Sequence, residues 1–222
     1  MSTESTEADS QYGDHLKRSR RMWDRWSDYY GMSERDFEPM RETAMAHLDL
    51  DGGERVLDVG CGPGVNLASL QEAVGPEGQV VAVDYSPEMV AAARERVEEH
   101  GWEHVDVRLA DATSVEFDGR FDGAIASLSM SVMPDVPRAV ENVSGHLRPG
   151  ARFVVFDIRP VPSGPLRIGN PLLRGFLRWY ANWNPEDSVL DSLQAAFDEC
   201  NVVETYMRGV TYTVRCEQSS LA

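Results

Sequence analysis

The sequence is poor in lysine, and this shortage narrows the choice of partners. Lys17 is the only lysine among 21 basic residues, whereas aspartate and glutamate number 37, so the formal net charge is −16. A phosphate backbone needs a basic footprint, and the composition therefore disfavours nucleic acid as a partner. A charge this far from zero is tolerated best where salt screens it. We therefore predict a halophilic, salt-adapted source.

Cysteine is also scarce. The chain has three cysteines, Cys61, Cys200 and Cys216. Their number is odd and no C-x-x-C spacing occurs, so we expect reduced thiols and neither a disulfide framework nor a metal site. His100 and His104 are four residues apart, but Gly101 lies between them and breaks the helix that would place them on one face. We expect no metal there.

Long apolar runs are absent as well. No run approaches the roughly 18 residues that a membrane span needs, and residues 1–14 are polar and acidic instead of resembling a signal peptide. We therefore expect a cytoplasmic protein with a disordered acidic tail over residues 1–14. With 222 residues and 42% apolar content, residues 15–222 suffice for one α/β domain.

The most informative motif lies between residues 56 and 84. The apolar run 56–59 leads into Gly60, Gly62 and Gly64, and a second apolar run, 80–83, ends in Asp84. This order predicts a buried strand, a glycine turn, a helix and a second strand with an acid at its tip. The helix N-terminus faces the ligand over the turn, and the acid is placed to accept hydrogen bonds from ribose hydroxyls. The unit predicts a ligand that contains adenosine.

The glycine spacing distinguishes between such ligands. Dinucleotide folds use G-x-G-x-x-G to bind a pyrophosphate, whereas this chain has G-x-G-x-G with Pro63 inside it, which disfavours a nicotinamide or flavin site. With Asp58 directly before it, the loop resembles that of class I S-adenosylmethionine-dependent methyltransferases. Their ligand carries an ammonium and a sulfonium and no phosphate, so a carboxylate such as Asp58 suits it.

The resemblance implies a set of cofactor-binding residues. Asp58, Gly60, Cys61 and Gly62 would lie by the methionine end of S-adenosylmethionine, Asp84 by the ribose, Tyr85 and Met89 by the adenine, Asp111 and Ala112 by the adenine amino group, and Ser127 and Leu128 by the reacting methyl. Ligands of open parallel sheets bind at the carboxyl ends of strands, which favours a binding role for Asp111 over that of a solvated loop acid.

Methyl transfer from a sulfonium is an in-line displacement, and alignment of the reactants can supply roughly 7 to 11 kcal/mol. A base is needed only where the nucleophile must lose a proton. Asp157, at the end of the fifth predicted strand, is the best candidate by position, with Tyr29 or Tyr30 behind it. The commoner role of a strand-end carboxylate is to cap a loop, and geometry decides between the two.

Strands alternate with helices along most of the chain, which predicts a parallel sheet with right-handed crossovers. The order resembles the Rossmann-like, seven-stranded methyltransferase sheet, mostly parallel with one antiparallel C-terminal strand and with helices on both faces. Cap helices are expected over residues 15–48, with the first closed by Gly31, and a last helix from residue 184 to about Cys200. Strands 202–208 and 210–216 would follow, joined at Gly209.

The first cap helix carries an aromatic stripe, Met22, Trp23, Trp26 and Tyr30, opposite a basic side. Such a stripe usually packs on the core, and the alternative is a cap over the cofactor. The proline-rich segment 160–187 interrupts the rhythm around a short amphipathic helix, which is more often docked on the core. We predict instead a lid that covers the acceptor and rests against a membrane surface.

The acceptor is constrained by absences. Nucleic-acid amino methyltransferases of this fold carry Asn or Asp, two prolines and an aromatic residue after the fourth strand, where this chain has Ala126 to Met130. That leaves a small-molecule or lipid-like acceptor, and parts of the chain are similar to quinone C-methyltransferases and phospholipid N-methyltransferases. The alternative is a non-catalytic module that binds S-adenosylmethionine or keeps the fold as a scaffold.

Overall fold

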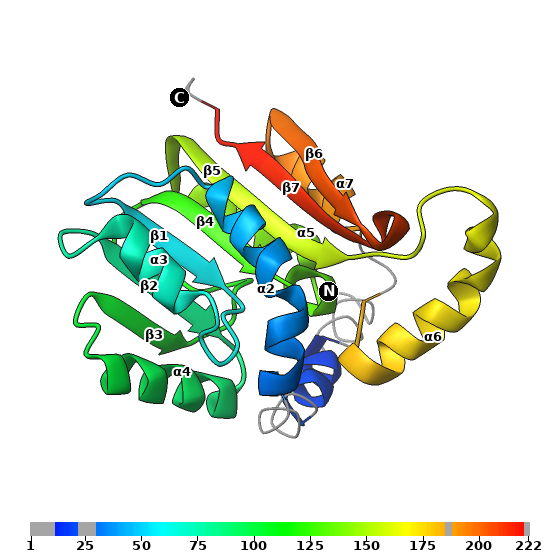
Figure 1. Ribbon diagram of the computed structural model, residues 1–222, viewed down its shortest axis with the longest axis horizontal. Helices are drawn as coiled ribbons and strands as arrows, with labels where there is room; N and C mark the ends of the chain where they lie inside the picture. The colour runs from blue at the N-terminus through cyan, green and yellow to red at the C-terminus, as the bar shows by residue number, and fades with distance from the viewer. Residues whose placement is uncertain (1–11, 22–29, 185–187, 220–222) are drawn as a thin grey trace, which may run out of the picture.

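Seven strands form one sheet in a computed structural model that describes residues 12–21, 30–184 and 188–219 (Figure 1). The strands are β1 (Arg55–Val59), β2 (Gln79–Asp84), β3 (Val105–Leu109), β4 (Phe121–Ser127), β5 (Leu147–Ile158), β6 (Glu199–Tyr206) and β7 (Thr211–Glu217). Their order is β3-β2-β1-β4-β5-β7-β6. Among these seven strands β7 alone is reversed, and it pairs antiparallel with β5 on one side and with β6 on the other. The predicted mostly parallel sheet is confirmed.

Helices cover both faces of the sheet, as predicted (Figure 1). The helices are α2 (Tyr30–Ala46), α3 (Leu67–Val74), α4 (Pro87–His100), α5 (Val136–Gly145), α6 (Asn170–Ala181) and α7 (Val189–Ala196), with short 3-10 turns η2 (Met130–Val132), η3 (Pro165–Gly169) and η4 (Met207–Gly209). Residues 12–21 are also helical. One core forms between the sheet and α2, α3 and α4, and the other between the sheet and α5 and α7.

The strands alternate between these two cores. Leu57 and Val59 of β1 pack with α5 and α7, whereas Val56 packs with α3 and α4. Since successive side chains of a strand point to opposite faces, a strand covered on both sides needs apolar residues at nearly every position. This explains the unbroken apolar run in the sequence.

The start and end of α4 follow from local chemistry. The Ser86 hydroxyl accepts a hydrogen bond from the Met89 amide at 3.3 Å, Pro87 occupies the first turn, and Gly101 ends the helix at φ 65°. Both boundaries agree with the sequence prediction, because an N-cap serine, a first-turn proline and a left-handed glycine are specific signals.

Two predicted helix ends are wrong. Gly31 lies inside α2, which begins at Tyr30, and therefore does not close a helix. The last helix ends at Ala196 and not near Cys200, because residues from Glu199 onward pair with β7. Its N-cap is Ser188, whose hydroxyl accepts from the Asp191 amide at 3.3 Å.

Some predictions concern residues outside the described part of the chain. The aromatic stripe falls on residues 22–29 and on Tyr30, whose side chain is not described, and the expected start of the last helix falls on residues 185–187. Residues 1–11 of the expected tail are also outside it. Residues 12–14 belong to the described N-terminal helix.

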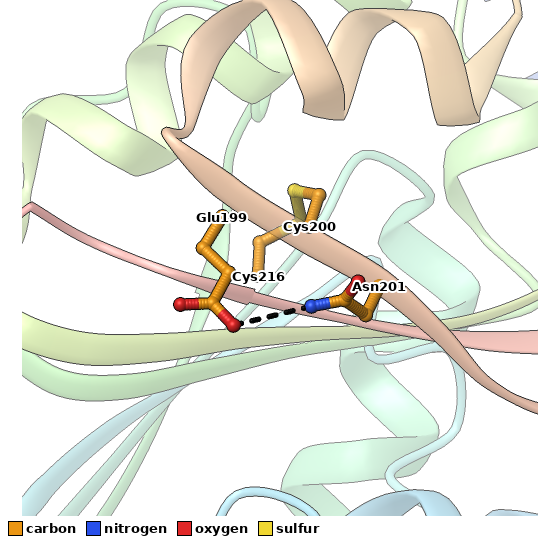
Figure 2. The surroundings of a disulfide bond; sticks show 4 residues. All are labelled: Glu199, Cys200, Asn201 and Cys216. Atoms are coloured by element: carbon orange, nitrogen blue, oxygen red, sulfur yellow. Dashed lines mark hydrogen bonds between the residues drawn. A yellow bond between two sulfur atoms is a disulfide. The ribbon is translucent and has the colours of Figure 1, made fainter.

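The expectation of three reduced cysteines is wrong for two of them. Cys200 and Cys216 are paired across β6 and β7, with their Cα atoms 4.1 Å apart, and form a disulfide (Figure 2). Directly opposed residues of an antiparallel pair are close enough to be bridged. The disulfide could not be predicted from the cysteine spacing, because the register of the hairpin brings the two cysteines together. Cys61 is a free, buried thiol.

None of the described helices combines the length and apolar character needed to cross a bilayer.

Candidate cofactor site

A cavity lies at the carboxyl ends of β1 to β4, where ligands of open parallel sheets bind. Nine residues expected to bind cofactor line it: Gly60, Gly62, Asp84, Tyr85, Met89, Asp111, Ala112, Ser127 and Leu128. They come from four separate strand ends and the start of α4, and the sheet order brings them to one edge.

The glycine turn is built around close packing at Gly60. Its backbone has φ 67°, and a Cβ atom there would lie 2.5 Å from the Cβ of Ser129. The Ser129 hydroxyl donates to the Val59 carbonyl at 2.7 Å, which fixes the loop after β4 against the turn. Because Gly60 has no side chain, the loop after β4 can pack directly against the glycine turn.

Asp84 organises the same region from the tip of β2. One carboxylate oxygen accepts from the Gly62 amide at 2.9 Å, and the other accepts from the Ser86 amide at 2.8 Å. The carboxylate therefore fixes the glycine turn and the start of α4 together. An ionised carboxylate accepts hydrogen bonds only, which suits hydroxyl donors of a ligand in the cavity.

Asp111 forms the far end of the cavity. One of its oxygens accepts from the Thr113 amide at 2.9 Å and from the Thr113 hydroxyl at 2.8 Å, and the other accepts from the Tyr12 hydroxyl. Burial and the Asp111 carboxylate raise the pKa of Tyr12, so the phenol stays protonated. The neighbouring Ala112 carbonyl accepts from the Asn142 amide at 3.0 Å, which fixes the loop from the side of α5.

The N-terminal helix, residues 12–21, borders this cavity, and three of its residues, Leu16, Ser19 and Arg20, contribute to the lining. Besides Tyr12, His15 makes a hydrogen bond between Nε2 and the Val132 carbonyl at 3.0 Å, and the Ser19 hydroxyl accepts from Asn182 at 2.7 Å. The helix is thus fixed at three points, to the loops after β3 and β4 and to the end of α6.

Backbone strain is present where β4 ends. Leu128 has φ 56°, although it is not glycine, and its amide donates to the Phe156 carbonyl at 2.7 Å. A left-handed residue of this kind costs about 1 to 2 kcal/mol and is found preferentially at functional sites. It lies beside Ser127 on the cavity wall.

Two predicted cofactor residues do not reach the cavity. Asp58 is fully buried, and Asn66 donates to both of its oxygens at 3.1 and 3.2 Å. Burial raises the pKa of Asp58 to about 7, against the opposing effect of the Asn66 hydrogen bond. Cys61 packs in the core with α3 and α4, and burial raises the pKa of its thiol.

Asp157, the predicted base, also lies outside the cavity lining. It is fully buried, and its two oxygens accept from the Ser131 amide at 2.8 Å and from the Ser131 hydroxyl at 2.6 Å. Burial raises the pKa of Asp157 to about 6 while these hydrogen bonds oppose the rise. The geometry favours the loop-capping role, because the carboxylate fixes η2. Tyr29 and the Tyr30 side chain lie outside the described residues.

The buried carboxyl of Asp58 gives a pH prediction. Its folded pKa is about 7, above the ordinary value of 3.8, so the folded state holds the proton more tightly than the unfolded state. The contribution of the Asp58 carboxyl to the free energy of unfolding is therefore fully present below about pH 4 and is lost as the pH rises to about 7. We expect the isosteric Asp58→Asn variant to match the wild type near pH 4 and to be more stable near pH 7.

Near pH 7 the free energy of unfolding of Asp58→Asn should exceed that of the wild type by an amount on the order of 3 kcal/mol, because one pKa unit corresponds to about 1.4 kcal/mol. Urea unfolding at several pH values measures it, and Asp106→Asn, a half-buried aspartate on β3 that pairs with Arg108, is the control. A constant difference between variant and wild type from pH 4 to pH 7 would contradict the raised pKa.

The sequence patterns do not indicate every residue of the lining, and Ser19, Thr113, Ser129 and Met133 carry no motif. The patterns also do not indicate Tyr12, which lies outside the lining but donates to Asp111. The basic N-terminal helix did suggest a cap over the cofactor, but its contact residues carry no motif of their own. Among the described residues, no group of three or more metal-ligating side chains is found.

The fold and the cavity together define a class of protein: Rossmann-like α/β proteins with a glycine turn after the first strand and an acid at the tip of the second. Residues 56–150, which include both features, match the family model described as "Methyltransferase domain".

Curated relatives extend this match. The chain is 37% identical over 140 residues to nocamycin O-methyltransferase of Saccharothrix syringae. The matched region covers 60% of this chain but only half of that protein. The chain is 34% identical over 177 residues to phosphatidylethanolamine N-methyltransferase of Cereibacter sphaeroides, covering 77% of this chain and 84% of that protein. Demethylmenaquinone methyltransferase of Anoxybacillus flavithermus is 28% identical, and the matched region covers 74% of this chain and 68% of that protein.

Solved structures show the same fold. A SAM-dependent methyltransferase from Aquifex aeolicus superimposes with a TM-score of 0.58 at 22% identity, covering 80% of this chain and 88% of that one. The [4+2]-cyclase SpnF has a TM-score of 0.58 at 26% identity, covering 75% and 57%. The chain belongs to the class I S-adenosylmethionine-dependent methyltransferase family.

Proposed function

We propose that the protein transfers the methyl group of S-adenosylmethionine to an amphiphilic small-molecule acceptor of the quinone or phospholipid type. The observation that carries the cofactor assignment is the convergence of the glycine turn, Asp84 and Asp111 on one cavity. The relatives named for phosphatidylethanolamine and demethylmenaquinone methylation support the acceptor class.

The residues fit this cofactor. Gly60 and Gly62 let the backbone approach the ligand, and the Asp84 carboxylate, an acceptor at the tip of β2, suits ribose hydroxyls. The Asp111 carboxylate suits the adenine amino group, which is a donor. Since Tyr12 already donates to Asp111, bound adenine would replace or share that hydrogen bond. Binding would then be coupled to the position of the N-terminal helix.

Bound S-adenosylmethionine supplies an electrophilic methyl group on a positive sulfur. The protein then needs to align an acceptor with that methyl and to exclude water. Ser127 and Leu128 line the cavity where β4 ends, and we assign them to the methyl end. With Asp157 engaged by Ser131, the proposal uses no base from that position. The proton that an amine or a quinol loses on methylation would then pass to water or to another group at the acceptor.

The alternative is a module that uses the fold without methyl transfer. The likeness to SpnF illustrates it, since SpnF is a [4+2]-cyclase with this fold. Cofactor binding alone does not separate the two, because both can retain S-adenosylmethionine.

Two measurements test the proposal in sequence. Calorimetry should show binding of S-adenosylmethionine and of its demethylated product, and the absence of heat and of thermal shift with both would refute the cofactor assignment. A screen with labelled methyl donor against quinols and phosphatidylethanolamine should then show transfer to one acceptor class. Cofactor binding without transfer to any of them would favour the alternative.

A further inference from the structure

Residues 165–181, comprising η3 and α6, leave apolar side chains uncovered. Of the ten large apolar side chains that are exposed among the described residues, six belong to this segment: Leu166, Ile168, Leu172, Phe176, Trp179 and Tyr180. Ile168 is 90% exposed and Leu172 is 83% exposed. Only Leu177 and Ala181 of α6 are buried. Figure 1 shows α6 at the edge of the molecule, away from the sheet.

The exposed side chains form one face of the helix. Leu172, Phe176 and Trp179 recur at helical spacing, and Phe176 stacks on Tyr180 with ring centroids 5.4 Å apart. Arg174 and Arg178 stand four residues apart on the opposite side. An apolar face with large aromatic side chains and an arginine-bearing polar face is typical of helices that lie in a membrane interface.

Charge distinguishes this segment from the rest of the chain. Residues 158–185 contain four arginines and no aspartate or glutamate, although acidic residues number 37 in the 222-residue chain. Arg159 is engaged, since it lies over the Tyr212 ring at 4.5 Å and donates to the Gly209 carbonyl. For Arg167, Arg174 and Arg178, no carboxylate of the described residues forms an ion pair. The segment offers positive charge to a partner.

Other occupants of this face fit less well. The cavity lining includes no residue of 160–184, so the exposed apolar side chains of this segment are not used to line the cofactor cavity. The lid stays a prediction. A second copy of α6 would cover the apolar face but would bring only more arginine to the arginines. An anionic lipid surface supplies both an apolar layer and negative charge.

We propose that η3 and α6 bind the headgroup region of an anionic lipid bilayer, with Leu172, Phe176 and Trp179 inserted and the arginines facing phosphates. Aromatic side chains favour this boundary because they have an apolar body and, in Trp179 and Tyr180, a polar group. The net charge of −16 would repel such a surface at low salt. At about 0.15 M salt the screening length is roughly 8 Å, so distant acids are screened while contacting arginines still act.

The location bears on catalysis. Asn182, directly after α6, donates to Ser19 of the N-terminal helix, which lines the cavity. Lipid binding by α6 would thus place the cofactor cavity, which the N-terminal helix borders, next to the bilayer, where an amphiphilic acceptor resides. This consequence rests on the proposed function, whereas the lipid binding itself does not.

Flotation with vesicles tests the proposal without measuring turnover. The full-length protein is mixed, at about 0.15 M salt, with vesicles of phosphatidylcholine alone or of phosphatidylcholine with phosphatidylglycerol. The variants are Leu172→Ser/Phe176→Ser/Trp179→Ser and Arg174→Gln/Arg178→Gln, with Val202→Ser, an exposed apolar residue on β6, as the control. Calorimetric binding of S-adenosylmethionine checks that each variant is folded.

We expect the wild type and Val202→Ser to float with the anionic vesicles and to bind neutral ones much more weakly. The arginine variant should bind anionic vesicles about 10- to 30-fold more weakly, as expected for two basic side chains near an anionic surface, and the triple variant should not float. No flotation of the wild type, equal binding to both vesicles, or a dimer that the triple variant dissociates in place of lipid binding would overturn the proposal. Lipid binding without methyl transfer would leave it standing and refute only the proposed function.

Discussion

Replacing Gly60 by alanine is expected to destabilise the protein and to remove most of its affinity for S-adenosylmethionine. At φ 67° an alanine costs about 1 to 2 kcal/mol. The new Cβ would also lie 2.5 Å from the Cβ of Ser129, a contact that can be relieved only by moving the loop after β4. Overpacking of this kind costs about 1 to 3 kcal/mol more. We expect a total loss of about 2 to 5 kcal/mol in the free energy of unfolding.

The matched control is Gly53→Ala. Gly53 has φ 89°, but nothing lies within 4 Å of a Cβ built there, and it is remote from the cavity. It should show the conformational cost alone and normal cofactor affinity. Urea unfolding and calorimetry measure both quantities. If Gly60→Ala is no less stable than Gly53→Ala and binds cofactor like the wild type, the close packing of the two loops is unimportant.

The second large effect is expected for Asp84→Ala. The change should weaken S-adenosylmethionine binding by about 1.5 to 3 kcal/mol, the loss expected when hydrogen bonds to a charged acceptor are removed. It also leaves the amides of Gly62 and Ser86 without their acceptor, so part of the loss arises from a loosened turn. An unchanged dissociation constant would place the ribose elsewhere.

A cofactor analogue separates these two causes. An analogue without the ribose 2′-hydroxyl should bind the wild type more weakly but should lose no further affinity in Asp84→Ala, since the partner is already absent. Equal losses in both proteins would assign the whole effect to the turn. Asp106→Ala, which removes a half-buried β3 aspartate that pairs with Arg108 and lies outside the cavity lining, is the control and should bind cofactor normally.

Both predictions involve residues that hold the backbone of the turn and that we also propose to bind the ligand. Asp84 fixes the glycine turn through the Gly62 amide, and Gly60 allows the close contact with the loop after β4. Site geometry and local stability are therefore coupled at this edge of the sheet. The strained Leu128 belongs to the same edge, next to the loop that packs on Gly60.

Local signals in the sequence were sufficient for much of the fold. The apolar runs of β1 and β2 and the cap of α4 at Ser86 depend on residues near in sequence, so their positions could be predicted. The acid at Asp84 and the glycine spacing likewise indicated an adenosine ligand, because a turn and its strand ends are contiguous in the chain.

Only the tertiary structure decided the direction of buried side chains and the contacts between distant segments. Asp58 and Asp157 occupy strand ends as predicted, yet Asn66 and Ser131 engage their oxygens within the protein. Tyr12 contacts Asp111 across 99 residues, a separation at which no local pattern operates.

The same reason explains the disulfide. Cys200 and Cys216 meet because β6 and β7 pair in a particular register, and the separate strands specify that register only once they are packed. The sequence by itself indicated most of the strands and helices, the glycine turn and a sheet edge suited to an adenosine ligand, since each depends on neighbouring residues. The tertiary structure determined which acids face the cavity, which helix borders it and which apolar face remains uncovered, since these depend on how the elements pack.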